Sequence, residues 1–332
     1  MRTAPMLRRL ITLAVVGVLT GLTGCSAAAP TGTGAPSSTP PAPAGFPVTI
    51  TTTLGQTVIP AQPQKVVTLI DDEFVVALGV VPVAMSRSPF GSTGMTPVVE
   101  EALGSAATPE LLDVTAGWPY EKIRLLEPDL ILGGVTKQDY DGLAAIAPTL
   151  PYEESSTTES WQDRQRTVGR ALGKSAEADA LVEKVEAEIA ETAASLGDAW
   201  NGKTFSFAFA FGQGQVSAMR NPDEAAAQLL GELGLVMDDA SQALSNPDGS
   251  GRVTLNLESL GALAADVVLV AGPADDLVEQ VTRNPGFIAA AEARGATVVV
   301  LPLDQAMPLV RPSALSASDA AKAVADALRA QD

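Results

Sequence analysis

The sequence predicts an α/β protein with two Rossmann-like lobes that one long helix joins, and with a ligand cleft between the lobes. Strand-like and helix-like segments alternate over residues 46–158 and again over residues 198–332, which is typical of parallel sheets. Residues 159–197 contain no proline and carry apolar side chains at helical spacing. The roughly 300 residues that follow the N-terminal leader are also more than one hydrophobic core usually serves.

The first 24 residues predict a secretory signal peptide. Arg2, Arg8 and Arg9 precede an apolar run over residues 10–22, and small residues follow it. The run is shorter than the roughly 20 residues that span a bilayer. An ordinary signal peptide with a chance cysteine, or an N-terminal membrane anchor, is the alternative interpretation.

Cys25, the single cysteine of the chain, directly follows a Leu-Thr-Gly sequence. This arrangement resembles the lipobox of bacterial lipoproteins, in which the cysteine sulfur receives a diacylglycerol and cleavage makes the cysteine the new N-terminus. Residues 26–45 lack charged and aromatic side chains, so we expect a lipidated, flexible tether over residues 25–45. The resemblance implies a protein on the outer face of the cell membrane that the lipid alone anchors.

The first lobe, residues 46–158, is expected to open with a β-hairpin and to continue as alternating strands and helices. Gly79 and Gly104 follow two of the predicted helices, where glycine commonly ends a helix. The predicted strands are residues 48–53, 56–59, 65–70, 81–85 and 129–132, and the predicted helices are residues 73–78, 96–103, 120–126 and 138–145.

The connecting segment, residues 159–197, is expected to contain one long helix after a shorter one. Over residues 176–195, Val182, Val185 and Ile189 share one helical face and the charged side chains lie on the other. Residues 161–172 predict the shorter helix.

The second lobe, residues 198–332, repeats the pattern of the first. Phenylalanines at 205, 207, 209 and 211 alternate with Ser and Ala, which predicts a strand with one face in a core. The predicted strands are residues 204–211, 266–270 and 297–302, and the predicted helices are residues 222–233, 257–263, 284–293 and 316–330.

The composition excludes several classes of function. The formal net charge is −18, and the basic leader makes the remainder more acidic still, so nucleic acid is not an expected partner. The chain contains no histidine, which excludes histidine-dependent catalytic triads and histidine-ligated metal sites. No nucleophile stands beside a base in a recognisable setting, so we expect no enzyme activity.

Several local sequences, taken in order, indicate a family. They are Pro-Gln-Lys-Val-Val at 63–67 with Ala-Leu-Gly at 77–79 and Val-Pro-Val-Ala at 81–84, the run from Tyr120 to Leu132, Arg-Ala-Leu-Gly-Lys at 170–174 with Glu-Ala at 177–178, and the segments 253–260 and 265–268. This order resembles the periplasmic-binding-protein family that carries iron–siderophore complexes, haem or cobalamin to ABC importers. The resemblance covers residues 46–330 and implies two lobes with a helical connector.

Residues that follow predicted strands are the candidates for ligand contact, because ligands of open α/β sheets bind beyond the carboxyl ends of the strands. Arginine presents paired donors to ligand oxygens that keep negative character, and aromatic rings supply rigid contact area. The candidate ligand-binding residues are Arg87, Trp118, Tyr120, Tyr140, Phe211, Met219, Arg220, Met307 and Arg311.

Each candidate also has a structural interpretation. Trp118 and Tyr120 could pack beneath their loop, the arginines after the second-lobe strands could pair with nearby acids, and the methionines could fill the core. Residues 71–73 are three consecutive acids before a predicted helix. Their expected role is to stabilise the helix dipole, and a polar edge of the cleft is the alternative.

The resemblance also implies how the protein would meet its transporter. Glu121 falls at the first-lobe position that contacts arginines of the permease in this family. The second-lobe position falls at Gln228, where the family often has Glu, and Glu224 or Glu232 could substitute.

The expected function is that of an extracytoplasmic lipoprotein that binds a ferric siderophore and delivers it to an ABC importer. We expect a monomer with the permease and a small-molecule iron chelate as partners, and no resident cofactor. The alternatives are a haem- or cobalamin-binding member of the same family and a cell-surface lipoprotein that has lost transport. Tyr120 and Tyr140 keep haem open, and the sequence does not distinguish hydroxamate from catecholate siderophores.

Overall fold

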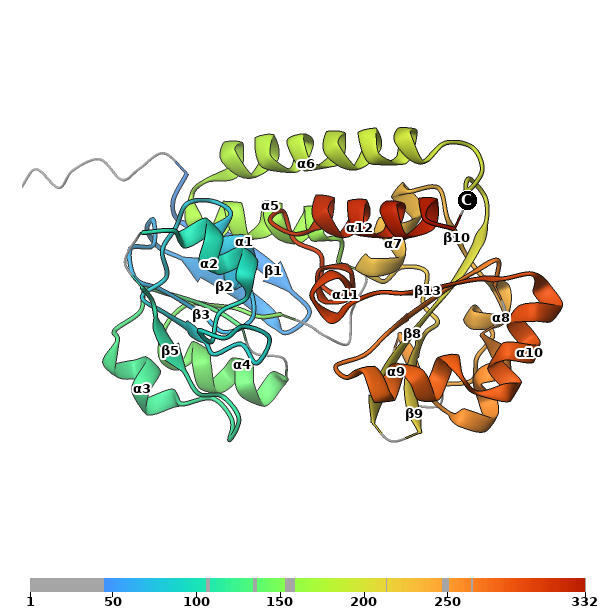
Figure 1. Cartoon of the computed structure of the whole chain (residues 1–332). Coiled ribbons are helices and arrows are strands. Elements are labelled where there is room, and N and C mark those ends of the chain that lie inside the picture. Colours follow the sequence, from blue (N-terminus) through green and yellow to red (C-terminus); the bar gives the residue numbers. More distant parts are fainter. Residues whose placement is uncertain are drawn as a thin grey trace, which may run out of the picture. The chain divides into compact units, whose positions relative to one another are not determined.

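The computed structural model describes residues 45–105, 108–133, 136–152, 159–212, 214–246, 251–263 and 265–331, which belong to one compact unit (Figure 1). Cys25, the leader and most of the tether lie outside the described residues. Two separate sheets, each with its own helices, confirm the predicted α/β class. Among the described residues, no helix has the length and apolar character needed to cross a membrane.

The first sheet is fully parallel and has the order β5-β4-β3-β6-β7, with a separate antiparallel hairpin of β1 and β2 beside it. Residues of the central strands are buried on both faces, as parallel strands between helices require. The strands are β1 Val48–Thr52, β2 Gly55–Ile59, β3 Val66–Thr68, β4 Ala84–Ser86, β5 Glu110–Leu112, β6 Leu130–Leu132 and β7 Thr149–Leu150. The helices are α1 Asp72–Val76, α2 Pro97–Leu103, α3 Tyr120–Leu125 and α4 Lys137–Ala144.

The connecting segment forms α5, Trp161–Leu172, and α6, Ser175–Leu196, which Gly173 separates in a left-handed conformation. Helix α6 packs against α5 along its first half and against the C-terminal helix α12, Ala317–Arg329, along its second half (Figure 1). No Pro or Gly interrupts α6, so it lacks the usual causes of a kink.

The second sheet is mixed, with the order β11-β9-β8-β12-β13 and with β10 paired to the start of β8. Strands β12 and β13 run parallel to β8, whereas β9 runs antiparallel to it. The strands are β8 Thr204–Gly212, β9 Gln215–Met219, β10 Val236–Met237, β11 Arg252–Asn256, β12 Val267–Ala271 and β13 Thr297–Val300. The helical elements are α7 Ala225–Glu232, α8 Asp239–Gln242, the 3₁₀ turn η2 Leu257–Ala262, α9 Asp275–Thr282, α10 Pro285–Arg294, α11 Leu303–Val310 and α12.

The sequence did not predict several short or interrupted elements. Strands β7 and β10 have two residues each, which is too short for an alternating pattern. Helix α11 contains Pro308, which argues against a helix from sequence alone. Because this helix was not predicted, the sequence suggested that Met307 and Arg311 both lie in a loop after β13. In the structure, Met307 lies on α11 and Arg311 directly follows the end of α11.

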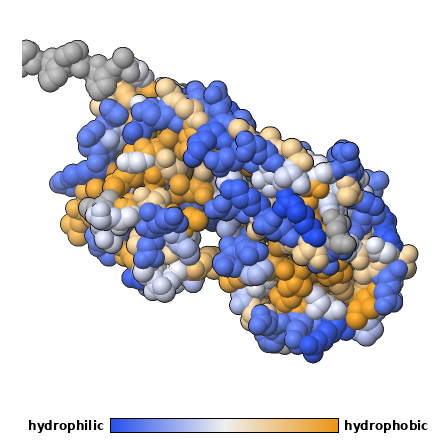
Figure 2. All heavy atoms as spheres, turned by 45° about the horizontal axis from the view of Figure 1, so that its top comes forward, coloured by the Kyte–Doolittle hydropathy of each residue, from blue (hydrophilic) through white to orange (hydrophobic). Residues whose placement is uncertain are grey.

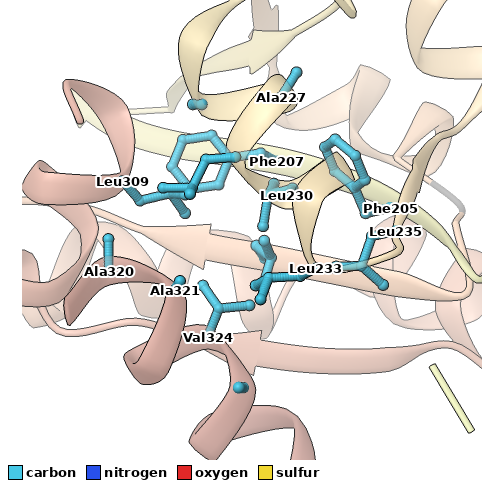
Figure 3. Packing of buried hydrophobic residues seen from close by; sticks show 14 of the residues in the cluster. Phe205, Phe207, Ala227, Leu230, Leu233, Leu235, Leu309, Ala320, Ala321 and Val324 are labelled. Atoms are coloured by element: carbon cyan, nitrogen blue, oxygen red, sulfur yellow. The ribbon is translucent and has the colours of Figure 1, made fainter. Parts of the chain in front are cut away.

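The core of the second lobe lies between β8 and the helices α7, α11 and α12. Figure 3 shows Phe207 of β8 facing Leu230 of α7 and Leu309 of α11, with Val324 of α12 nearby. Phe205 and Phe207 of the phenylalanine-rich strand are buried in this core, as predicted. The prediction of a single buried face is wrong, because Ala208 and Ala210 are buried in a second core on the other face of the strand.

Replacement of Phe207 by Ala should lower the free energy of unfolding by about 3–5 kcal/mol, since a fully buried aromatic leaves both lost contacts and a cavity. Phe211 is the matched control: it lies on the same strand, but 45% of it is exposed, so its replacement by Ala should cost much less. Urea unfolding of both variants measures the difference. Equal costs would contradict this assignment of the core.

Candidate functional site

A cavity of about 970 Å³ lies between the two lobes. Its first-lobe wall comes from the residues after β3 and β4, at the carboxyl ends of the central parallel strands, where the fold places ligands. Its second-lobe wall comes from α11 and the residues that follow it, together with the start of α7. The first turn of α5 closes the space between these walls.

Aromatic and aliphatic side chains make up much of the cavity wall. Phe74 and Phe90 come from the first lobe, Tyr152 follows β7, and Trp161 begins α5. Phe90 is half exposed, whereas Trp161 is 2% exposed. This lining offers rigid contact area to a bulky ligand with apolar surface.

Two arginines enter the cavity from opposite lobes. Arg87 follows β4, and its guanidinium passes so close to Gly94 that a Cβ there would lie 2.5 Å from Nη1. Gly94 also has a positive φ of 87°, so glycine suits this position in both backbone and space. Arg311 comes from the end of α11, and its guanidinium carbon lies 5.6 Å from the centre of the Tyr152 ring.

The three consecutive acids at 71–73 have three different environments. Asp71 is fully buried and accepts two hydrogen bonds from the guanidinium of Arg164, from Nε to Oδ1 at 2.9 Å and from Nη2 to Oδ2. Asp71 is the N-cap residue of α1, but its side chain makes no capping hydrogen bond and forms this ion pair instead. Asp72 and Glu73 lie in the first turn of α1, where acids suit the helix dipole as expected.

Glu73 joins the two lobes. Its Oε2 accepts hydrogen bonds from the hydroxyls of Ser313, at 2.5 Å, and Ser316, at 3.0 Å, in the segment before α12. Its Oε1 accepts a hydrogen bond of 3.4 Å from Thr96 of the first lobe. Glu73 therefore forms a polar edge beside the cavity, which is the alternative role that the sequence suggested for these acids.

Asp72 is half buried in the cavity wall between these two neighbours. Its pKa is raised from 3.8 to about 7, first because burial disfavours the charged form and then because Glu73 and Asp71 add negative charge. Arg311 opposes the shift with the smallest effect. The group is thus poised between its neutral and ionised forms near neutral pH.

The structure places only part of the predicted site at the cavity. Arg87, Met307 and Arg311 line it. The residues that sequence reasoning missed are chiefly Asp72, Glu73, Phe74, Tyr152, Trp161 and Arg164. Residues 71–74 also follow a strand, so the same rule could have identified them as candidates for ligand contact. They were not chosen because the acids at 71–73 were interpreted as residues that stabilise the start of a helix.

Trp118 and Tyr120 do not line the cavity. Both pack against the first-lobe core, and the Tyr120 hydroxyl donates to Oδ1 of Asp139 on α4 at 3.5 Å. A Cβ at Gly142 would lie 2.8 Å from the Tyr120 ring, so this helix approaches the ring closely. Burial and the nearby Asp139 carboxylate raise the pKa of Tyr120.

Four other candidates also lie away from the cavity. The hydroxyl of Tyr140 is 3.4 Å from that of Thr57 in the hairpin, so neither tyrosine on which the haem alternative rested lines the cavity. Met219 is buried in the second-lobe core, and Phe211 is exposed at the end of β8. Arg220 donates to the carbonyl oxygens of Leu244, at 2.9 Å, and Gln242, at 3.3 Å, which fixes the chain after α8.

The candidate docking residues differ in exposure. Glu121 is exposed in the first turn of α3. Gln228 is half buried on α7, and its side-chain amide donates to the carbonyl of Asp223 at 2.7 Å. Glu224, a suggested substitute, is 3% exposed and accepts a hydrogen bond of 2.9 Å from Arg252. Glu232, the other substitute, accepts a hydrogen bond of 2.9 Å from Gln162.

The chain is similar to known binding proteins. Residues 72–302 match the family described as periplasmic binding protein. The Bacillus subtilis protein YhfQ, provisionally named an ABC transporter substrate-binding lipoprotein, is 26% identical over 247 residues, which cover 69% of this chain and 72% of the relative.

Solved structures share the whole architecture. PiaA of Streptococcus pneumoniae TIGR4, in complex with ferrichrome, has a TM-score of 0.73 and 25% identity, with coverage of 85% of this chain and 98% of that chain. SirA of Staphylococcus aureus, complexed with staphyloferrin B, has a TM-score of 0.68 and 24% identity, with the same coverage of the two chains. The fold is therefore that of two-lobed siderophore-binding proteins.

Replacement of Asp72 by Asn should raise the free energy of unfolding at pH 8. A carboxyl with a folded pKa of about 7 and an ordinary value of 3.8 binds its proton more tightly in the folded state. The stabilisation that the folded wild type gains from proton binding by Asp72 is therefore complete below pH 4. It declines as the pH rises to 7 and is absent above pH 7. One pKa unit corresponds to about 1.4 kcal/mol. The free energy of unfolding of Asp72→Asn should therefore exceed that of the wild type by the order of a few kcal/mol at pH 8 and by little at pH 4.

Asp276 supplies the matched control, because it is an exposed acid in the first turn of α9. Its replacement by Asn should cost only about 0.3–1 kcal/mol, from the lost interaction with the helix dipole. Chemical unfolding at pH 4, 6 and 8 tests both variants. A wild type whose stability does not decline relative to the Asp72→Asn variant between pH 4 and pH 8 would contradict the assignment.

Proposed function

Because this chain belongs to the periplasmic binding protein family, we propose that it binds a ferric siderophore outside the cytoplasmic membrane and delivers it to an ABC importer. The observation that carries the proposal is the cavity between the lobes, which combines an aromatic lining with one arginine from each lobe. The ligand oxygens of a ferric chelate keep negative character, and Arg87 and Arg311 can donate to them from opposite sides.

The chemistry of the ligand explains what the cavity does not need to supply. A siderophore satisfies iron with its own oxygens, so the protein has only to hold the outer surface of the complex. Among the described residues, no group of three or more Asp, Glu, His or Cys side chains is arranged to hold a metal ion. The proposed function therefore rests on shape, aromatic contact and charge.

We further propose that Cys25 carries the lipid that tethers the protein to the outer face of the membrane, as the lipobox-like sequence suggests. The ligand-loaded lobes would then work as a monomer. On the face drawn in Figure 2, apolar residues show in separate areas with hydrophilic residues around them. That distribution supports a monomer on this face, because permanent subunit interfaces are large and apolar.

Replacement of Arg87 or Arg311 by Ala should weaken the binding of a ferric siderophore. Loss of a charge-assisted hydrogen bond costs about 1.5–3 kcal/mol, which corresponds to roughly a ten- to hundredfold higher Kd. The fluorescence of Trp161, in the cavity wall, provides the titration signal. Arg124→Ala, which removes an exposed arginine from α3, is the control and should leave the Kd unchanged.

Ferrichrome, ferrioxamine B and a ferric tris-catecholate form a suitable first panel of probes. If none of them changes the fluorescence or the melting temperature, the proposed function is wrong. If one binds but both arginine variants bind it as tightly as the wild type does, the arginines play no part in binding.

We propose that Glu121 contacts the permease, because it is exposed and does not line the cavity. Glu121→Ala should bind ligand normally but fail to restore uptake in cells that lack the native protein, and Glu121→Lys should be worse because it would present a positive charge to permease arginines. Glu101→Ala, which removes an exposed glutamate from α2, is the control and should restore uptake. Gln228→Glu should not reduce uptake, and full uptake by both Glu121 variants would exclude this contact.

A further inference from the structure

The charged side chains of the cavity are mainly acidic. The lining contains five carboxylates and three arginines, namely Asp72, Glu73, Glu159, Glu224 and Asp304, and Arg87, Arg164 and Arg311. Two partners behind the wall complete the set, since Asp71 pairs with Arg164 and Arg252 pairs with Glu224. With these included, six carboxylates face four guanidinium groups, so the formal charge of the site is −2.

Part of the positive charge is already committed within the protein. Arg164 is shared by Asp71 and by Glu159, whose carboxylate lies 3.6 Å from Nη1. Arg311 stacks on Tyr152, 5.6 Å from the ring centre. The cations at the cavity therefore suit a ligand with a few polarised oxygens better than one with a large negative charge.

Three lining acids, Asp72, Glu73 and Asp304, form no ion pair within 4 Å among the described residues. Asp304 is exposed, whereas Asp72 is half buried and is therefore the less screened charge at the cavity. Among the described residues, no ion pair within 4 Å and no side-chain hydrogen bond engages the Asp72 carboxylate, whereas Asp71 has Arg164 and Glu73 has two serine hydroxyls. Asp72 lines the cavity wall, where charges are screened less than they are in bulk water. A ligand cation there would be attracted, and a ligand anion would be repelled.

We propose that Asp72 makes the cavity select ferric chelates by charge, so that it favours a chelate with a peripheral ammonium group, accepts a neutral one and rejects a polyanionic one. This inference rests on the proposed function, because it specifies the class of siderophore at the same site. Three singly charged hydroxamate groups balance Fe(III), whereas a tris-catecholate complex keeps a net negative charge. The cavity thus favours hydroxamate siderophores, and among them those with a free amine.

Two probes that differ by one charge test the proposal directly. Ferrioxamine B is a linear ferric trihydroxamate with a free ammonium group, and its N-acetyl derivative has the same iron centre without that charge. The wild type should bind the ammonium form at least about tenfold more tightly, which corresponds to 1.4 kcal/mol. A ferric tris-catecholate should bind more weakly than either.

Asp72→Asn should reduce the preference for the ammonium form to less than about threefold and should improve binding of the tris-catecholate. Asp276→Asn removes the same charge from an exposed site on α9 outside the cavity lining, and it should keep the wild-type order of affinities. The paired probes also test the wild type alone, so the result does not depend on how well a variant folds.

The pH dependence gives a second readout. The groups that face Asp72 are Asp71 and Glu73 from its own segment and Arg311 from the second lobe, and the balance of their effects and of burial puts its pKa near 7. Below that pH the carboxyl becomes protonated, so the preference for the ammonium probe should fall toward that of the Asp72→Asn variant, by about tenfold in total between pH 8 and pH 5. The Asp72→Asn variant should show no such change.

The outcomes separate this inference from the function on which it rests. If the wild type binds the tris-catecholate as tightly as ferrioxamine B, or if Asp72→Asn keeps the full preference for the ammonium probe, charge selection by Asp72 is overturned and siderophore binding stands. If none of the ferric complexes binds, the proposed function and the inference both fall.

Discussion

The ion pair between Asp71 and Arg164 is the constraint on which the cavity depends. Asp71 lies between β3, the central strand of the first sheet, and α1, and Arg164 lies in the first turns of α5. Both side chains are almost fully buried, at 0% and 4% exposure, and two hydrogen bonds fix their relative orientation. Burial acts against the charge of Arg164, but the Asp71 carboxylate outweighs it and raises the pKa of Arg164. A buried pair of this kind adds little net stability, but loss of one partner costs about 3–5 kcal/mol, so it fixes geometry more than it stabilises the fold.

That geometry holds the connecting segment against the first lobe and also brings the second lobe into place. Gln165 of α5 donates to the carbonyl of Phe74 at 3.0 Å, while Gln162 of the same helix donates to Glu232 of α7. Glu73 meets the segment before α12, and α12 packs along α6. The lobes are thus linked by a rigid helix on one side and by direct polar contacts beside the cavity on the other. We infer that ligand entry needs small adjustments of these contacts and of exposed side chains such as Phe90, and no large hinge motion.

The sequence predicted the fold well because its signals are local. The hairpin, α5, α6 and the phenylalanine-rich strand follow from periodicity and from glycine and proline at their ends. The site was predicted less completely because it depends on which strands are central. Arg87 follows β4, next to the centre of the sheet, and reaches the cavity, whereas Trp118 and Tyr120 come after the edge strand β5 and pack toward α4. Strand order is a tertiary property that periodicity does not encode. Trp161 was missed for a similar reason, since its place in a predicted connecting helix gave no sign that the cavity would form beside it.

Residues 71–73 show how three identical charges in sequence acquire separate roles in space. The outer two acids have partners that the fold itself supplies, Arg164 for Asp71 and the serines before α12 for Glu73. These partners fix the backbone on both sides, so Asp72 must face the cavity even though burial and its neighbours disfavour its charge. An unfavourable carboxylate that its surroundings hold in place is characteristic of functional sites, where stability is lower than the fold allows. In a chain with a net charge of −18, one more acid on the open surface would change the electrostatics little. Asp72, by contrast, lies in the cavity wall, where its charge determines which ligands are attracted or repelled.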